Sequence, residues 1–177
     1  EELNKLLLLD DLDDEVYDLL EEKLRQLNPK SKILKDTGAP VRGDIQKIKL
    51  PVWMGSLDKI KPGKRETELW FDRYRGPYMI SEKLDGISGL IVYSEETTKI
   101  YTRGDGEYGQ DISFLEKYLD LPDVSENICV RGEFVLKNSL FEKKYKSKFP
   151  KPRTVVSSLV NSKRPDPGIL NDIDFLV

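Results

Sequence analysis

The sequence has no histidine, one cysteine and one alanine among its 177 residues, and no long apolar run. Without histidine there is no Ser-His-Asp triad, no imidazole metal ligand and no imidazole general base. The lone Cys129 excludes an internal disulfide and a multi-cysteine zinc site, which fits an intracellular, cytoplasmic location. Every apolar run falls far short of the roughly 20 residues that span a bilayer, so no membrane partner is expected. Proton chemistry must use carboxylates, lysine or bound water.

Charge is unevenly distributed although the net charge is only −3. Residues 1–22 carry ten acidic side chains, whereas residues 143–153 carry six basic side chains and no acidic one. Two interpretations of the basic run remain open. It is either a solvated helix face and loop, or a patch that contacts phosphates.

Local patterns predict an α+β fold: a short N-terminal helical segment, then a mainly antiparallel sheet with flanking helices. Helices are expected at about 14–28, 66–75, 111–119, 138–145 and 153–161, and strands at three places within 78–102, at 128–136 and at 173–177. Because the sequence stops inside an apolar strand pattern, we expect a truncated fragment, or a subunit that another polypeptide completes.

The segment Lys83-Leu84-Asp85-Gly86 is the most informative one. The apolar run Tyr78–Lys83 precedes it and the run Ile87–Tyr93 follows it, which predicts a β-hairpin with a lysine and a carboxylate at its lip. A lysine at the end of a sheet is a candidate covalent nucleophile. Taken alone, these are ordinary turn residues.

Three further segments carry polar groups suited to a nucleotide. The first, 101–111, contains Arg103 among closely spaced glycines, which favours a phosphate contact or else a simple hairpin turn. The second contains Glu133, which suits a ribose hydroxyl or else faces solvent, and Gly132 is expected to leave room beside it. The third, 53–58, is a Gly-Ser bend that packs either over a base or as an ordinary loop.

Together the four segments indicate attack by Lys83 on a nucleotide α-phosphate. Burial and a neighbouring cation such as Arg103 would favour the neutral, nucleophilic amine. A divalent cation, Mg²⁺ or Mn²⁺, would neutralise the developing charge, held mainly by phosphates, water and a few carboxylates. No site made of protein ligands alone is expected for this metal.

In order and spacing these motifs resemble the nucleotidyltransferase superfamily of DNA ligases, RNA ligases and capping enzymes. They are most similar to the adenylation domain of NAD-dependent DNA ligases. Lys83-Leu84-Asp85-Gly86 resembles that family's adenylated-lysine motif, and Thr102–Gly106 resembles its second motif. Asp14-Glu15-Val16-Tyr17-Asp18 is similar to the helical segment that holds nicotinamide mononucleotide (NMN). The low alanine content also suggests an AT-rich source such as a phage or large virus.

The resemblance implies a role for each matching residue. Lys83 is the catalytic nucleophile, and Asp85 orients it or the metal shell. Ser81 stands where the family usually has a glutamate facing adenine, and Glu82 lies one position nearer the lysine. The expected cofactor contacts are Ser56, Leu57, Ser81, Glu82, Lys83, Arg103 and Glu133 for the adenylate, and Asp14, Tyr17 and Asp18 for NMN. In the phosphate-patch interpretation, the nucleic-acid contacts are Lys148, Lys151 and Arg153.

The sequence therefore predicts a shortened NMN-binding segment, 1–40, and a partial adenylation domain, 41–177. The implied activity is transfer of AMP from NAD to lysine, for sealing nicks in double-stranded DNA together with the remaining ligase domains or a complementary subunit. Three alternatives stay open: an ATP-dependent DNA or RNA ligase fragment, an inactive nucleotide-binding subunit of a ligase complex, and an unrelated α+β domain.

Overall fold

The computed structural model describes residues 14–34, 47–57, 60, 62–63, 65–124, 126–162 and 165–177. The chain divides into two compact units, Glu1–Pro40 and Val41–Val177. Among the described residues, no helix combines the length and the apolar character that crossing a membrane requires.

The first unit contains helix α2 (Asp14–Leu27) and the short 3₁₀ helix η1 (Lys32–Leu34). The helix predicted for residues 14–28 is therefore confirmed. Arg25 donates to Glu21, one turn earlier, at 2.7 Å, a spacing that supports a helix from its own surface. The described structure does not include the side chains of Asp14, Tyr17 and Asp18, so their roles stay predictions.

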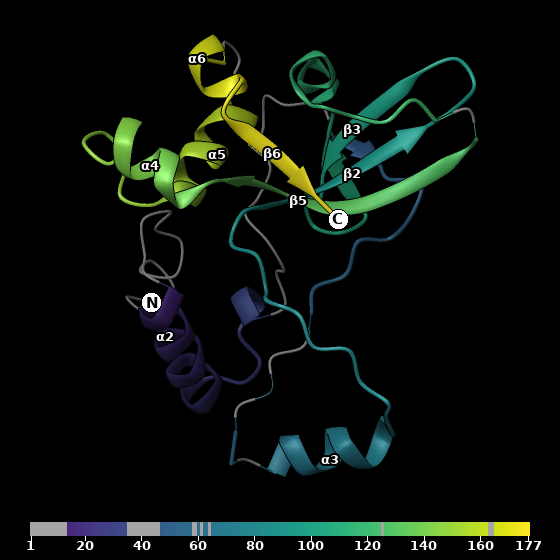
Figure 1. The fold of residues 1–177 in the computed structure, drawn as a ribbon. Coiled ribbons are helices and arrows are strands. Elements are labelled where there is room, and N and C mark those ends of the chain that lie inside the picture. The colour runs from purple at the N-terminus through teal and green to yellow at the C-terminus, as the bar shows by residue number, and fades with distance from the viewer. Residues whose placement is uncertain are drawn as a thin grey trace. The chain divides into compact units, whose positions relative to one another are not determined.

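The second unit is built on a four-stranded antiparallel sheet with the order β3-β2-β5-β6 (Figure 1). Branched and aromatic residues, which suit a pleated surface, dominate its central strands. Its strands are β2 (Ile87–Tyr93), β3 (Thr98–Thr102), β5 (Ile128–Leu136) and β6 (Ile173–Leu176). A separate two-stranded sheet pairs β1 (Lys47–Lys49) with β4 (Tyr108–Gln110). The expected α+β class with antiparallel pairing is confirmed.

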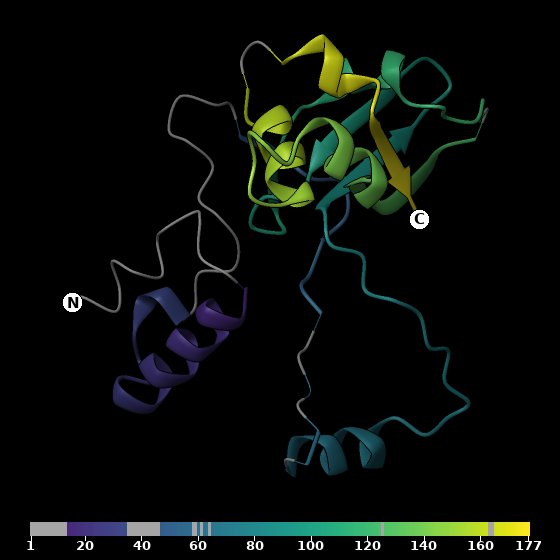
Figure 2. The same ribbon diagram turned by 60° about the vertical axis from the view of Figure 1, so that its left-hand side comes forward.

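Helices cover one face of the four-stranded sheet (Figure 2). They are η2 (Ser113–Tyr118), α4 (Asn138–Lys144), α5 (Pro152–Val160) and α6 (Pro167–Leu170). Val155, Val156 and Leu159 of α5 are buried in one cluster with Ile91 and Phe134 of the sheet. We call this side the core face, because burial of these apolar side chains is the main stabilising term of the unit.

Two glycines make room for aromatic rings on the core face. Gly89 and Gly132 lie opposite each other on β2 and β5, and opposite residues of an antiparallel pair share a face. A Cβ on Gly89 would lie 2.1 Å from the Phe134 ring, and one on Gly132 would lie 2.5 Å from the Phe175 ring. The prediction that Gly132 leaves room beside Glu133 is therefore wrong, because the two residues are on opposite faces.

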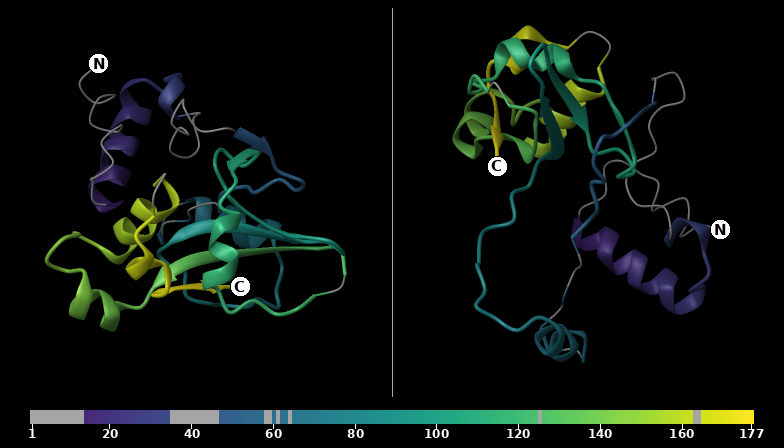
Figure 3. Two further views of the ribbon diagram at one scale, coloured as in Figure 1. Left: turned by 90° about the horizontal axis from the view of Figure 1, so that it is seen from above. Right: turned by 90° about the vertical axis from the view of Figure 1, so that its right-hand side faces the viewer.

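Some expected elements differ from the structure. Residues 78–83 form no strand, so the predicted hairpin around Lys83 is wrong, and 78–102 holds two strands instead of three. Residues 74–86 are an irregular connection between α3 (Arg65–Arg73) and β2 (Figure 3). The helix expected at 111–119 is the 3₁₀ helix η2. The helices predicted near 66–75, 138–145 and 153–161 and the strands near 128–136 and 173–177 are confirmed.

A mostly buried carboxylate ties α4 to the turn before β6. Asp172 accepts hydrogen bonds from Nζ of Lys144 through both oxygens at 2.9 Å, and another from the Tyr145 hydroxyl. Burial opposes ionisation of Asp172, but the hydrogen bonds from Lys144 and Tyr145 outweigh it and hold the pKa of Asp172 below its ordinary value. Burial and the Asp172 hydrogen bond raise the pKa of Tyr145.

Asp172→Asn should lower the free energy of unfolding at pH 7 by about 1–2 kcal/mol, because the charge-assisted bonds are lost. A lowered folded-state pKa adds stability above the ordinary carboxyl pKa and loses it as pH falls through the folded value. The difference from wild type should therefore shrink toward zero below the ordinary value of 3.8. Urea denaturation measures it. Glu142→Gln, which breaks an exposed pair with Lys146, is the control and should change little.

Candidate functional site

The second face of the four-stranded sheet, which we call the site face, is covered by a loop instead of helices. Leu90 of β2 is buried there with Leu50 and Met54 of that loop. The N–H of Leu50 donates to the Glu107 carbonyl at 2.8 Å, and that of Met54 donates to the Gly106 carbonyl at 2.9 Å. These bonds and the apolar contact hold the loop 50–57 against the sheet.

A tight turn, residues 103–109, lies beside this loop. Asp105 accepts from the N–H groups of Glu107 and Tyr108 at 3.0 and 2.7 Å, and the bond from Tyr108 is the main reason that the pKa of Asp105 is lowered. Gly104 has φ +56°, and a Cβ there would lie 1.9 Å from the Tyr108 carbonyl oxygen. The backbone conformation and the close approach both require glycine.

Two arginines of the site face bind the same loop. Arg103 follows β3 and donates from Nη1 to Oγ of Ser56 at 2.9 Å. Arg131 of β5 donates from Nη2 to the Gly55 carbonyl at 3.2 Å. Trp53 packs against Gly55, with 73% of its surface exposed. The predicted contacts Ser56 and Arg103 are thus neighbours, although 47 positions separate them in the chain.

Ser88 forms hydrogen bonds with both Arg103, the candidate phosphate contact, and Glu133, the candidate ribose contact. Its hydroxyl donates to Glu133 at 2.8 Å, and its carbonyl accepts from the N–H of Arg103 at 3.1 Å. Ser88 and Glu133 are opposite each other in the β2–β5 register, and Arg131 lies two residues before Glu133 on the same face. The site face therefore presents a carboxylate, a hydroxyl and two guanidinium groups in one area.

The lysine segment meets the sheet at Gly86. A Cβ there would lie 2.1 Å from the Phe134 carbonyl oxygen, so only glycine allows this close approach. Asp85 accepts from Arg153 at 3.4 Å, an exposed pair that links the motif to the start of α5. Lys83 is exposed and forms no ion pair within the described part of the chain. The arrangement expected for Lys83, burial beside Arg103, is not what the structure has.

The remaining predicted residues have varied surroundings. Ser81, Glu82 and Leu57 are exposed. Because residues 78–83 form no strand, strand alternation does not decide which way Ser81 and Glu82 face. Several members of the basic run are paired with acids: Lys144 with Asp172, Lys146 with Glu142, and Arg153 with Asp85. Lys148 is exposed and Lys151 is half-buried.

Two residues of this area, Ser88 and Arg131, were not among the predicted site residues. Arg131 lies two positions before Glu133, and strand alternation alone could have placed both on one face. Ser88 carries no comparable signal, because its importance comes from the register that pairs it with Glu133.

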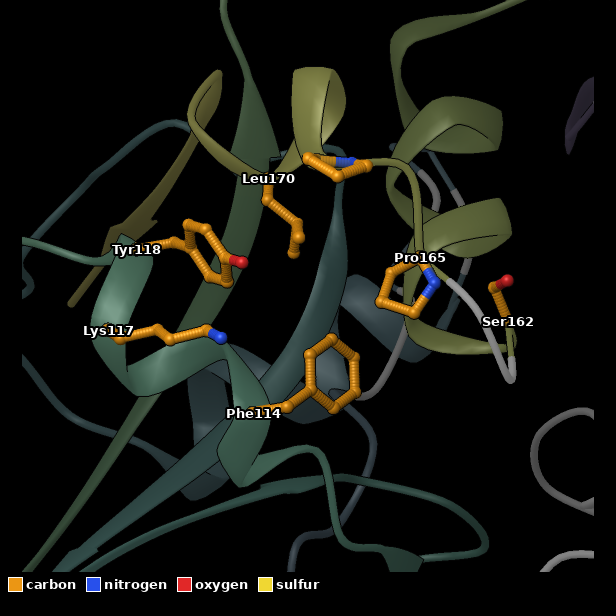
Figure 4. A pocket seen from close by; sticks show the side chains of 7 residues that line it. Phe114, Lys117, Tyr118, Ser162, Pro165 and Leu170 are labelled. Carbon is orange, nitrogen blue, oxygen red and sulfur yellow. The ribbon is translucent and has the colours of Figure 1, made fainter.

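A surface pocket of about 280 Å³ lies elsewhere, between η2 and the chain around α6 (Figure 4). Phe114, Lys117, Tyr118 and Leu170 line it together with two prolines and Ser162. None of the predicted catalytic or cofactor-binding residues lines this pocket. The site face and this pocket are therefore distinct.

Comparison with known proteins identifies the family. Residues 43–174 match the NAD-dependent DNA ligase adenylation domain. A DNA ligase of Acanthamoeba polyphaga mimivirus is 45% identical over 157 residues, which cover 86% of this chain and 24% of that ligase. The putative DNA ligase 205R of Invertebrate iridescent virus 6 is 41% identical over 92% of this chain and 25% of its own length. A bacterial DNA ligase from Psychromonas ingrahamii is 27% identical over 92% of this chain and 26% of its own length.

An α+β domain with this motif order and this family match has the nucleotidyltransferase fold. The chain belongs to the family of NAD-dependent DNA ligase adenylation domains. It spans about a quarter of the length of the curated relatives that it matches.

Gly104→Ala should destabilise the second unit more than Gly63→Ala does. Both glycines have positive φ, but only Gly104 would also collide with backbone, whereas nothing lies within 4 Å of a Cβ on Gly63. We expect about 1 kcal/mol of strain for Gly63→Ala and clearly more for Gly104→Ala. Urea denaturation of the two variants measures the difference. Equal losses would show that the close approach to Tyr108 does not constrain the turn.

Proposed function

We propose that residues 41–177 accept an adenylyl group from NAD on the amine of Lys83, as the first step of nick sealing by a DNA ligase. The convergence of Ser56, Arg103 and Glu133 on one sheet face is the observation that carries this proposal. Membership of the family supports NAD as the adenylate donor.

In the proposed reaction, the neutral amine of Lys83 attacks the adenylyl phosphorus of NAD. A P–N bond forms, the P–O bond to the departing nucleotide breaks, NMN leaves and the amine loses a proton. Arg103 offers a planar guanidinium to the phosphate, and its bond to Ser56 holds it in place. Glu133 accepts a hydrogen bond from a ribose hydroxyl, in place of or beside Ser88.

We assign binding of the NMN half of NAD to the first unit. Asp14, Tyr17 and Asp18 occupy positions i, i+3 and i+4 of α2, which fall on one side of a helix. We assign Tyr17 to stacking on nicotinamide and the two aspartates to its ribose or amide. Residues 1–40 would then be the NMN-binding segment, which makes NAD the substrate instead of ATP.

A divalent cation is not assigned to protein ligands. Among the described residues, no group of three or more acidic, cysteine or histidine side chains could hold one. Asp85 instead pairs with Arg153, and Asp105 accepts backbone N–H groups. Mg²⁺ or Mn²⁺ would arrive with the phosphates of the nucleotide.

Nicked DNA and the rest of the ligase are the proposed partners, inside the cell. Lys148, Lys151 and Arg153 remain the proposed DNA contacts. The Arg153–Asp85 pair supports a second task for Arg153, which is to hold the lysine motif near α5.

Lys83→Ala should abolish covalent labelling by NAD carrying radiolabelled adenylate. Residues 1–177 are tested in place of the matching quarter of the mimivirus ligase, so that a full-length enzyme is assayed. Lys83→Arg should fail as well, because a guanidinium keeps the charge but is not a nucleophile. Lys143→Ala, an exposed lysine of α4, is the control and should label normally.

Labelling of Lys83→Ala at the wild-type level would contradict the assignment of the nucleophile. Stronger labelling by ATP than by NAD would favour the ATP-dependent alternative. A folded wild-type protein that takes no label from either donor would favour an inactive subunit.

A further inference from the structure

The pocket between η2 and α6 takes no part in the adenylation chemistry proposed above. Its volume is about 280 Å³, and none of the predicted catalytic or cofactor-binding residues lines it. Both of its sides belong to the second unit, Val41–Val177. The chemistry of its lining indicates a ligand of a different kind from the adenylate.

The fold holds both sides of this pocket in place. At the start of η2, Ser113 donates its N–H to Asp111 at 2.8 Å, and its hydroxyl accepts from the N–H of Ile100 at 3.0 Å. Leu115 of η2 and Leu170 of α6 are buried in the same apolar cluster. The pocket is therefore already formed, and a ligand need not order it.

The apolar part of the lining suits a flat ring. Phe114, Leu170 and two prolines supply carbon surface, and proline side chains lose no rotamer freedom when a ligand covers them. An engineered cavity of about 150 Å³ with Leu, Ile and Phe walls binds benzene. A pocket of about 280 Å³ therefore has room for a six-membered ring with a short substituent.

The polar part of the lining offers hydrogen-bond donors. The Lys117 amine lies 4.9 Å from the centroid of the Tyr118 ring. Figure 4 shows this amine and the Tyr118 hydroxyl turned toward the space between Leu170 and Phe114. Within the described part of the chain, neither group has a hydrogen bond or an ion pair. An ammonium has three donors and no acceptor, and a hydroxyl can donate as well, so the pocket suits a negatively charged acceptor.

Among the described residues, no acidic one lines the pocket to compete for these donors. Asp166, which lies between two lining prolines, accepts the N–H of Gly168 at 2.8 Å as the cap of α6. A lone phosphate would leave the apolar walls unused. A nucleic-acid backbone requires several cations, whereas Lys117 is the only one in the described lining. A carboxylate joined to an aromatic ring uses both parts of the lining.

We infer that the pocket between η2 and α6 binds an aromatic ring that carries a carboxylate on a short arm. The ring packs between Phe114 and Leu170, and the carboxylate accepts hydrogen bonds from the Lys117 amine and the Tyr118 hydroxyl. Two sources provide this chemistry, a free aryl carboxylate and a polypeptide that ends in phenylalanine. The site is separate from the one proposed for the adenylate, so binding here and AMP incorporation succeed or fail independently.

Backbone amide NMR of the 177-residue chain tests this site, with 3-phenylpropionate as the probe. The amides of Phe114, Lys117 and Leu170 should shift with one dissociation constant, whereas those of Ser88 and Arg103 on the site face stay unchanged. The amine 3-phenylpropylamine has the same ring and the opposite charge, and propionate lacks the ring. Neither should cause these shifts at the same concentrations.

Lys117→Met should weaken binding of 3-phenylpropionate by about tenfold, because a hydrogen bond to a charged group is lost while the length of the side chain is kept. Lys143→Met, at an exposed lysine of α4, is the matched control and should bind like the wild type. Both lysines are exposed, so neither change should lower the melting temperature.

A peptide arm of the same titration distinguishes the two sources. N-acetylated Gly-Gly-Phe carries the same ring and a carboxylate at its chain end. Tighter binding of this peptide than of 3-phenylpropionate would assign the site to a protein chain end. Tighter binding of 3-phenylpropionate would assign it to a small molecule.

Three results would overturn the inference. The first is an absence of shifts at about 10 mM 3-phenylpropionate, a concentration that half-fills a site with a dissociation constant of about 10 mM. The second is equal shifts from 3-phenylpropylamine, because Lys117 would then not select the charge. The third is equal affinity of Lys117→Met and the wild type. None of them bears on Lys83, whose test is covalent labelling.

Discussion

The candidate site depends on the register between β2 and β5. That register places Ser88 opposite Glu133, and the continuation of β3 brings the N–H of Arg103 to the Ser88 carbonyl. A shift of one residue would turn Glu133 toward the core face and Phe134 toward the site face. Burial of the Phe134 ring against Gly89 opposes that shift, because a Cβ on residue 89 would lie 2.1 Å from the ring. The apolar core thus fixes the position of the polar site on the opposite face of the sheet.

The groups proposed to bind the nucleotide and the proposed nucleophile differ in how firmly the fold holds them. Groups suited to phosphate and ribose are anchored by the sheet, by the loop 50–57 and by the turn 103–109. The nucleophile candidate Lys83 is exposed, although Gly86 only three residues later is packed against β5. Gly86 therefore joins the lysine segment to the sheet, whereas residues 78–85 before it are exposed.

Much of the fold and of the candidate site could be predicted from the sequence, wherever the local residue pattern determines the structure. The branched runs at 87–93 and 128–136, the helix before Pro29 and the motif residues Ser56, Arg103 and Glu133 were found that way. Residues 78–83 have strand propensity, but no strand lies beside them in the described part of the chain, and a strand exists only through pairing. The prediction that Gly132 leaves room beside Glu133 was wrong because neighbouring residues of a strand point to opposite faces. Ser88 was missed because register depends on contacts between distant segments. β4 and α6, of three and four residues, are too short for a periodic signal.

The central claim is that the site face, and not the pocket between η2 and α6, receives the adenylate. Backbone amide NMR shifts of the 177-residue chain during titration with AMP test it most directly, because even weak binding is detected. The account predicts that the amides of Ser56, Ser88, Arg103 and Glu133 shift together with one dissociation constant, while those of Lys117 and Tyr118 stay unchanged. Shifts confined to Phe114, Lys117 and Tyr118 would contradict it.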